Sequence, residues 1–129
     1  MKFEVDHMHL RSLDPVATAE FYVGMFGGAV TDRMEQGETL RVTVELSGLR
    51  LFIDRVPVGT QGPLKPPSLG LEHLGLIVAD LDAAVAELTA KGAVFTLQPT
   101  SPRPGTKIAF VQAPDGAQVE ILERAARPA

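Results

Sequence analysis

The sequence predicts an α+β fold of two tandem βαβββ modules, whose strands form a curved mixed sheet around a cleft. One observation is an internal repeat. The second is the same order of patterns in each repeat: a strand-like alternating stretch, a stretch with helical apolar spacing, and three further strand-like stretches. One helix covers only one face of such a sheet, so two facing modules would enclose a cleft. The equivalent residues include His7 and His73, Leu10 and Leu76, Asp14 and Asp80.

The helix of each module has a clear start in the sequence. Asp14 and Asp80 stand where an N-cap carboxylate accepts a backbone hydrogen bond, and Pro15 occupies the favoured first helical position. Gly92 follows the second apolar pattern and is typical of a residue that ends a helix. The sequence therefore predicts helices at about 15–26 and 81–91.

Apolar and alternating stretches bounded by turn residues predict four strands in each module. The Ser47–Gly48 and Pro114–Gly116 junctions predict that the last two strands of each module form hairpins. The expected strands cover about 3–11, 28–34, 39–46 and 49–55 in the first module, and about 71–78, 93–98, 107–112 and 117–123 in the second.

The length of 129 residues suits one domain, expected to cover 1–129. Within it, residues 57–70 are rich in Pro and Gly and are typical of a linker. We therefore expect module one at 1–56 and module two at 71–124.

Composition excludes several classes of protein. A net charge of -4 with scattered basic residues argues against a nucleic-acid partner. The absence of Cys excludes disulfides and thiol nucleophiles. No stretch approaches the ~18 apolar residues of a membrane span, and the N-terminus lacks a signal-peptide pattern, so no membrane partner and a cytoplasmic location are expected.

Strand alternation places three potential metal ligands on the faces that the helices leave uncovered. His7 and His73 lie on that face of the first strand of each module, and Glu120 lies on that face of the last strand. Two neutral imidazoles and a carboxylate suit a divalent metal. Phe52 takes the repeat position of Glu120 and cannot bind metal, so the site keeps open coordination positions, which suits catalysis.

Further polar residues share these faces. His9 is a candidate general base, an outer partner of a ligand, or a wall residue, because an imidazole titrates near neutral pH. Glu45 is a second candidate base, although a solvated sheet face is the better explanation of this residue. The segment 101–107 is a candidate mobile lid. The candidate substrate-binding residues are Arg41, Phe52 and Arg103.

Three stretches resemble the vicinal oxygen chelate superfamily, also called the glyoxalase/bleomycin-resistance/dioxygenase superfamily. They are "DHMHLRSLDPVATAEFY" (6–22), "EHLGLIVADLDAAVAEL" (72–88) and "APDGAQVEIL" (113–122). The resemblance implies paired βαβββ modules, frequent homodimers, and one divalent ion (Fe, Mn, Zn, Ni or Mg) held by His7, His73 and Glu120. It also implies a small-molecule substrate.

The resemblance implies several reactions. The preferred one is a metal-dependent, glyoxalase-like lyase or isomerase acting on a small oxygen-chelating substrate. Glyoxalase I proper uses a fourth ligand where Phe52 stands, so the three-ligand set is also similar to extradiol-type dioxygenases and fosfomycin-type thiol transferases. In those transferases a Thr is usual at the position of His9. A metal-free, drug-binding protein of the bleomycin-resistance type is a further alternative, against which the intact ligand set argues.

Overall fold

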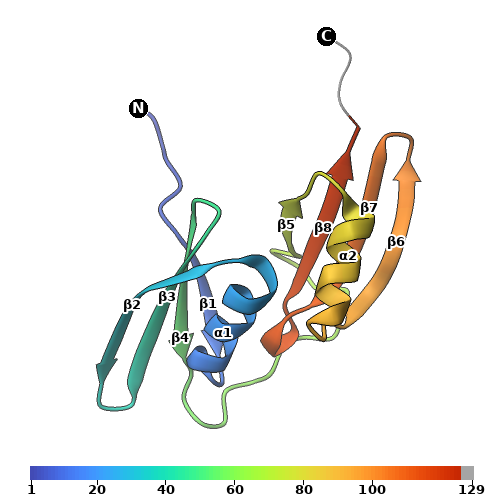
Figure 1. Cartoon of the computed structure of the whole chain (residues 1–129). Helices are drawn as coiled ribbons and strands as arrows, with labels where there is room; N and C mark the ends of the chain where they lie inside the picture. The colour runs from blue at the N-terminus through green and yellow to red at the C-terminus, as the bar shows by residue number, and fades with distance from the viewer. Residues whose placement is uncertain (126–129) are drawn as a thin grey trace. The chain divides into compact units, whose positions relative to one another are not determined.

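The computed structural model describes residues 1–125 and divides the chain into two compact units, Met1–Pro63 and Leu64–Ala129 (Figure 1). The α+β class and the βαβββ order of both modules are confirmed. The first unit contains β1 (Met8–Ser12), α1 (Pro15–Phe26), β2 (Ala29–Gln36), β3 (Thr39–Leu46) and β4 (Leu49–Arg55). The second contains β5 (Leu74–Ile77), α2 (Leu81–Ala90), β6 (Phe95–Arg103), β7 (Thr106–Gln112), a 3-10 turn (Pro114–Gly116) and β8 (Gln118–Arg124).

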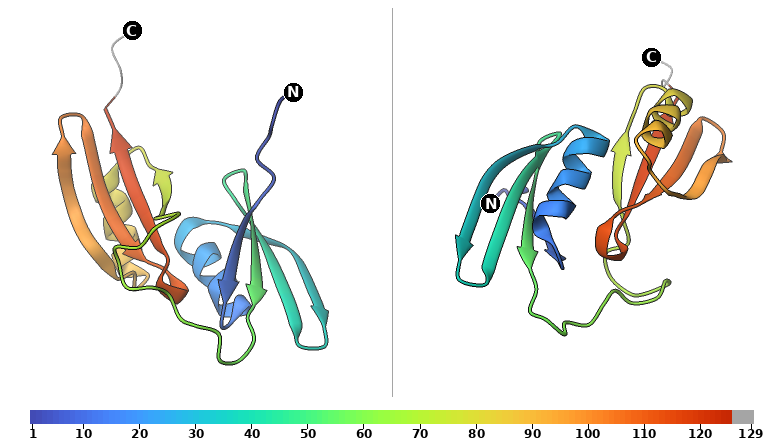
Figure 2. Two further views of the ribbon diagram at one scale, coloured as in Figure 1. Left: turned by 180° about the vertical axis from the view of Figure 1, so that it is seen from behind. Right: turned by 60° about the horizontal axis from the view of Figure 1, so that its bottom comes forward.

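Each unit has its own four-stranded mixed sheet with the same topology. The strand orders are β1-β4-β3-β2 and β5-β8-β7-β6, with the first and last strands of each module paired in parallel. In Figure 1 and Figure 2 each helix lies against one face of its own sheet. We call the opposite face of each sheet its helix-free face.

The cores lie between each helix and its sheet. Alternate residues of the strands point to the helix, and they are almost fully buried there. In the first unit they are Val42, Val44, Leu51 and Ile53, and in the second Ala109, Val111, Val119 and Ile121. The intervening residues lie on the helix-free faces, as the alternation predicts.

Both helices begin at the predicted caps. The Asp14 side chain accepts a hydrogen bond from the backbone N–H of Ala17 at 3.2 Å, and the Asp80 side chain accepts one from Ala83 at 3.0 Å. The first helix ends at Gly27, whose φ of 76° is in the left-handed region that glycine adopts without strain. Neither helix of the described part of the chain has the length and apolar content that a membrane span requires.

The first strand of each module begins later than expected. The prediction of a strand from residue 3 is wrong, since β1 begins at Met8, and β5 begins at Leu74. Met8 pairs with Leu51 while β4 starts at Leu49, so residues before about 6 extend past the end of their sheet. His7 and His73 therefore immediately precede their strands.

The prediction of a loop that acts as a lid at 101–107 is also wrong. β6 continues to Arg103 and β7 starts at Thr106, so the segment is the tip of a hairpin rather than a separate lid. β6 includes Pro102 because it is the edge strand of its sheet, where a missing N–H costs no ladder hydrogen bond.

Candidate metal centre

The second unit brings together two of the expected metal ligands. His73 Nε2 lies 3.8 Å from Glu120 Oε2, and the two side chains are 31% and 18% exposed. Gly75 pairs with Glu120 in the β5–β8 register. A Cβ built on Gly75 would already contact Glu120 Oε1 at 3.6 Å, so a larger side chain there would cover the carboxylate. The pair is thus held on the helix-free face with nothing from Gly75 above it.

The ring of His73 is fixed by two further contacts. Its Nδ1 is hydrogen-bonded to the carboxylate of Glu72, the preceding residue. The ring of Phe110 packs edge-to-face against it, with centroids 5.0 Å apart. Phe110 lies directly opposite Glu120 in the β7–β8 register. One nitrogen of His73 is therefore engaged, and the other points toward Glu120.

The donor set of this pair fits a divalent cation. Zinc and similar ions bind imidazole nitrogen and carboxylate oxygen, and two ligands of one tetrahedral ion lie about 3.4 Å apart. The observed separation of 3.8 Å is close to that value. Residues 1–125 contain no group of three or more His, Cys, Asp or Glu side chains that forms a metal-binding cluster. The third expected ligand, His7, belongs to the first unit.

In the first unit, His7 lies beside an aromatic residue instead of a carboxylate. Its ring centroid is 4.3 Å from that of Phe52, and its side chain is 39% exposed. The register pairs His9 with Phe52 as it pairs Gly75 with Glu120, so Phe52 occupies the position equivalent to Glu120. His7 Nδ1 is hydrogen-bonded to Asp6 Oδ2 at 2.7 Å.

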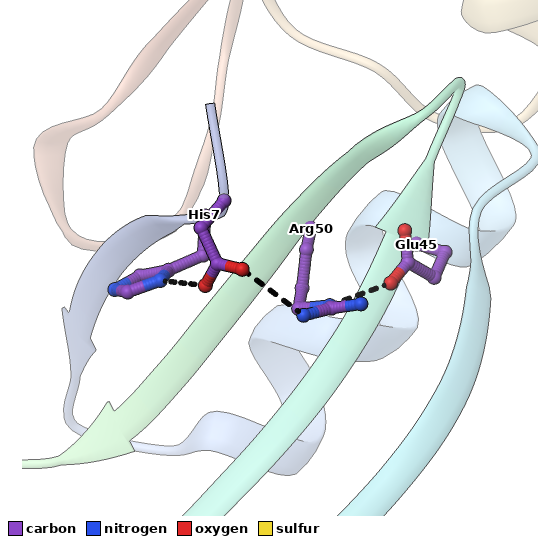
Figure 3. A network of polar contacts seen from close by, with 4 residues as sticks. His7, Glu45 and Arg50 are labelled. Atoms are coloured by element: carbon purple, nitrogen blue, oxygen red, sulfur yellow. Dashed lines mark hydrogen bonds and ion pairs between the residues drawn. The ribbon is translucent and has the colours of Figure 1, made fainter. Parts of the chain in front are cut away.

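A row of charged side chains continues from His7 across the first sheet. Figure 3 shows it: Asp6 Oδ1 lies 3.6 Å from Arg50 Nη1, and Arg50 Nε donates to Glu45 Oε1 at 2.9 Å. The hydrogen bond from His7, with a contribution from Arg50, lowers the pKa of Asp6 below its ordinary value. Glu45, a predicted base, is thus engaged by Arg50.

A second charged cluster joins His9 to Asp54 and Arg41. Arg41 donates to both carboxylate oxygens of Asp54, at 2.7 and 3.0 Å, and His9 Nε2 lies 2.9 Å from Asp54 Oδ2. The guanidinium of Arg41 also stacks over Phe52 at 4.3 Å. The hydrogen bond from Arg41 lowers the pKa of Asp54, against the opposing effect of burial. Sequence reasoning missed Asp54, although alternation already places it on the face of Phe52.

The remaining candidate, Arg103, lies away from the His73–Glu120 pair within the second unit. It pairs with Thr106 at the hairpin tip, and Thr106 lies opposite Arg124, four residues along β8 from Glu120. Lys107, which follows Thr106, donates to Asp82 at 2.9 Å. Among residues 64–125, the strand register thus keeps Arg103 apart from the pair.

Comparison with known families decides the relationship. The family model of the glyoxalase/bleomycin resistance protein/dioxygenase superfamily matches residues 6–110. The chain belongs to this superfamily. Members of the superfamily commonly bind a divalent metal and act as dimers on small molecules. The His73–Glu120 pair agrees with that donor chemistry.

Several superfamily relatives match nearly the whole chain. The uncharacterized protein YaeR of Escherichia coli K12 is 26% identical over 126 residues, covering 94% of this chain and 96% of that one. The crystal structure of a glyoxalase family protein from Enterococcus faecalis matches with a TM-score of 0.78 and 26% identity, covering 93% and 97% of the two chains. Maize glyoxalase I matches with a TM-score of 0.74 and 22% identity, covering 95% of this chain and 45% of that one, and shows the shared fold.

Proposed function

We propose that this chain is a metal-dependent enzyme of the vicinal oxygen chelate type. Its preferred reaction is that of a glyoxalase-like lyase or isomerase acting on a small substrate with two neighbouring oxygens. The observation that carries the proposal is the His73–Glu120 pair, an imidazole nitrogen and a carboxylate oxygen that face each other at 3.8 Å. Membership of a superfamily that includes glyoxalase I supports the choice of reaction.

In this proposal His7, His73 and Glu120 hold one divalent ion, whose identity we leave among Fe, Mn, Zn, Ni and Mg. When bound, the ion supplies Lewis acidity toward the substrate oxygens. Glu120 contributes the negative charge of the set from a largely buried position, and Phe52 leaves the equivalent position of the first module without a ligand. Open coordination positions then remain for substrate.

Proton transfer is assigned to the first module. His9 uses Nε2 to contact Asp54 and is 39% exposed, so its Nδ1 is the nitrogen that exchanges a proton with substrate. Glu45 is the weaker candidate base because Arg50 occupies one of its oxygens. Phe52, Arg41 and Arg103 are proposed to bind substrate. Arg41 does so as a guanidinium already stacked on Phe52 and paired with Asp54 through Nε and Nη2, not as a free cation.

The proposal is tested by metal analysis of purified protein. We expect one divalent ion per chain, and loss of that ion in His73→Ala and Glu120→Gln. Glu123→Gln is a matched control on the same strand, because glutamine can still accept the hydrogen bond that Glu123 receives from the backbone N–H of Leu81. Metal content that is unchanged in both ligand variants would remove the proposal.

A second candidate is an extradiol-type dioxygenase, because Phe52 stands where a fourth ligand would be and leaves a set of three. The same three-ligand set also fits a fosfomycin-type thiol transferase. A dioxygenase loaded with ferrous iron consumes O₂ with a catechol and yields a coloured product. Failure to consume O₂ with any catechol would end that candidate.

Metal-free drug binding is separated from both enzymes by a thermal shift assay with divalent ions. Stabilisation by one class of ion supports the enzymes, because a ligand that binds only the folded state raises its stability. A homodimer, a cytoplasmic location and a single domain over 1–129 complete the proposal.

A further inference from the structure

Each histidine of this chain makes its closest carboxylate contact through one ring nitrogen. The chain contains three histidines. His7 and His73 both use Nδ1, toward Asp6 and Glu72 respectively. His9 differs, because it uses Nε2 toward Asp54. The three residues therefore fall into two geometric classes.

The contacts define where each neutral ring carries its proton. A neutral imidazole has one N–H and one nitrogen with a lone pair, and an ionised carboxylate can only accept. The nitrogen within hydrogen-bonding distance of a carboxylate is therefore the one that bears hydrogen. For His73 that nitrogen is Nδ1, because Nε2 lies 3.8 Å from Glu120, beyond hydrogen-bonding distance. His7 and His73 then carry Nδ1–H and present a bare Nε2, whereas His9 carries Nε2–H and presents a bare Nδ1.

We infer that Asp6 and Glu72 are positioning residues that fix the Nδ1–H tautomer of His7 and His73, so that each presents Nε2 to a cation. We infer equally that Asp54 fixes the opposite tautomer of His9 and keeps its Nε2 out of the ligand set. The cation part of this inference rests on the proposed function, whereas the tautomers do not.

The internal repeat supports the inference. The spacing from His7 to His73 is 66 residues (73 minus 7), and the spacing from Asp6 to Glu72 is also 66 (72 minus 6). Each acid thus immediately precedes its histidine in both modules, and each reaches the same nitrogen. One such contact is a common surface feature, but the same contact at both repeat positions is a shared local geometry.

The second module supplies an independent argument. With its proton on Nδ1, His73 directs the lone pair of Nε2 toward Glu120 Oε2 at 3.8 Å. With Glu72 accepting the proton of Nδ1 in a hydrogen bond, the Nε2 lone pair of His73 and a carboxylate oxygen of Glu120 face each other as two electron-pair donors, the arrangement that a cation binds.

In the first module the positioning carboxylate is itself held. Asp6 contacts His7 through Oδ2 and Arg50 through Oδ1, and Arg50 is oriented in turn by Glu45 (Figure 3). Because both oxygens of Asp6 have partners, its carboxylate is constrained toward His7. Partners of this kind orient a ligand imidazole and raise its basicity, and their loss weakens metal binding by about 10- to 100-fold.

The tautomers are measured directly by long-range ¹H–¹⁵N NMR of the metal-free, full-length protein. The spectrum contains the signals of only three imidazoles. It is recorded at alkaline pH, and the ¹⁵N chemical shifts verify that each ring is neutral. We expect Nδ1–H for two rings and Nε2–H for the third, with His7→Ala, His9→Gln and His73→Ala assigning the signals.

Asp6→Ala and Glu72→Ala test the positioning role. Each is expected to shift the ring that follows it toward the mixture of tautomers seen in free imidazole, and to weaken divalent-ion binding measured by calorimetry by about 10- to 100-fold. Asp6→Asn and Glu72→Gln retain an accepting oxygen and should restore part of the Nδ1–H population. Glu4→Ala and Glu87→Ala remove equal charge from the same modules and should change neither reading, because Glu4 pairs with Lys2 and Glu87 pairs with Lys91.

The outcomes separate this inference from the proposed function. Nε2–H at His7 or His73 in the unsubstituted protein, or no tautomer change in the Asp6 and Glu72 variants, would overturn the inference. The expected tautomers in a protein that binds no divalent ion would support the positioning role and contradict the proposed function.

Discussion

The helix-free faces of the two modules have the same backbone and different chemistry. In the second module, Gly75 and Glu120 occupy paired positions, and the carboxylate is left facing His73. In the first module, the equivalent positions hold His9 and Phe52. The second face therefore retains a pair of metal-binding atoms, whereas the first has an aromatic ring and an additional imidazole.

The difference shows how a repeated module acquires two roles. The first face is stabilised by its own ion pairs, in which Asp54 links Arg41 to His9 and Arg41 stacks over Phe52. Helix-facing positions, in contrast, remain apolar and buried in both modules. Helix-facing positions thus exchange one apolar residue for another, whereas the other side of each sheet changes its chemical type.

The largest expected effect concerns the shared cores. Ile53 and Ile121 are equivalent positions, 0% and 2% exposed. Because the helix-facing sides are alike, Ile53→Ala and Ile121→Ala should each lower the free energy of unfolding by about 2–5 kcal/mol, measured by urea denaturation with circular dichroism. Leu71→Ala is the control, since Leu71 is 92% exposed and should change stability by less than about 0.5 kcal/mol. A clear loss in one module only would show that the cores are not equivalent.

The second prediction concerns a substitution that gives the first module a carboxylate where the second module has one. Phe52→Glu places a carboxylate beside His7, as Glu120 lies near His73. An added anionic ligand should tighten divalent-ion binding by roughly tenfold, measured by calorimetry, because affinity rises with the charge of the ligand set. Phe52→Leu controls for loss of the aromatic ring and should leave the affinity unchanged. Equal affinities in the two variants would indicate that residue 52 does not face the ion.

The third prediction concerns the ion pairs that only the first module has. Arg41 lowers the pKa of Asp54 in the folded protein, so the ionised carboxylate stabilises the fold above its ordinary pKa of about 3.9. That contribution is lost as the pH falls through the lowered folded-state pKa. Asp54→Asn should therefore cost about 1 kcal/mol at neutral pH and progressively less below about pH 4.

Thermal unfolding across pH measures this difference. Asp82→Asn is the control, because Asp82 is 71% exposed and its pair with Lys107 is at the surface. A difference between wild type and Asp54→Asn that persists unchanged at acid pH would contradict the assignment.

The smallest effect is expected at the β6–β7 hairpin. Lys107 contributes one exposed ion pair to Asp82, and solvent and salt screen such pairs strongly. Lys107→Met should therefore leave the melting temperature almost unchanged, and less changed than in Asp54→Asn. A larger loss would show that the hairpin tip has a structural role beyond this ion pair.

Sequence patterns predicted the faces of the strands better than their ends or their partners. Alternation placed His73 and Glu120 on one face, and the capping residues Asp14 and Asp80 marked the helix starts. The stretch before about residue 6 alternates like a strand but extends past the start of β4, so the pattern alone overextended β1.

Partners on one face depend on side-chain conformation and cross-strand register, which periodicity does not specify. The Arg41–Asp54 contact therefore could not be predicted without the β3–β4 register, which places those two residues opposite each other. The choice of ring nitrogen at His7, His9 and His73 likewise depends on rotamers. The segment 101–107 was expected to be a lid because the sequence pattern does not reveal that β6 is an edge strand, which tolerates proline.

Diffraction from crystals grown with a divalent metal, measured at its absorption edge, tests the central claim most directly. The account predicts one anomalous peak about 2.0–2.2 Å from Nε2 of His73, from the Glu120 carboxylate and from Nε2 of His7. No peak at saturating metal, or a peak bound elsewhere or through Nδ1 of either histidine, would contradict it.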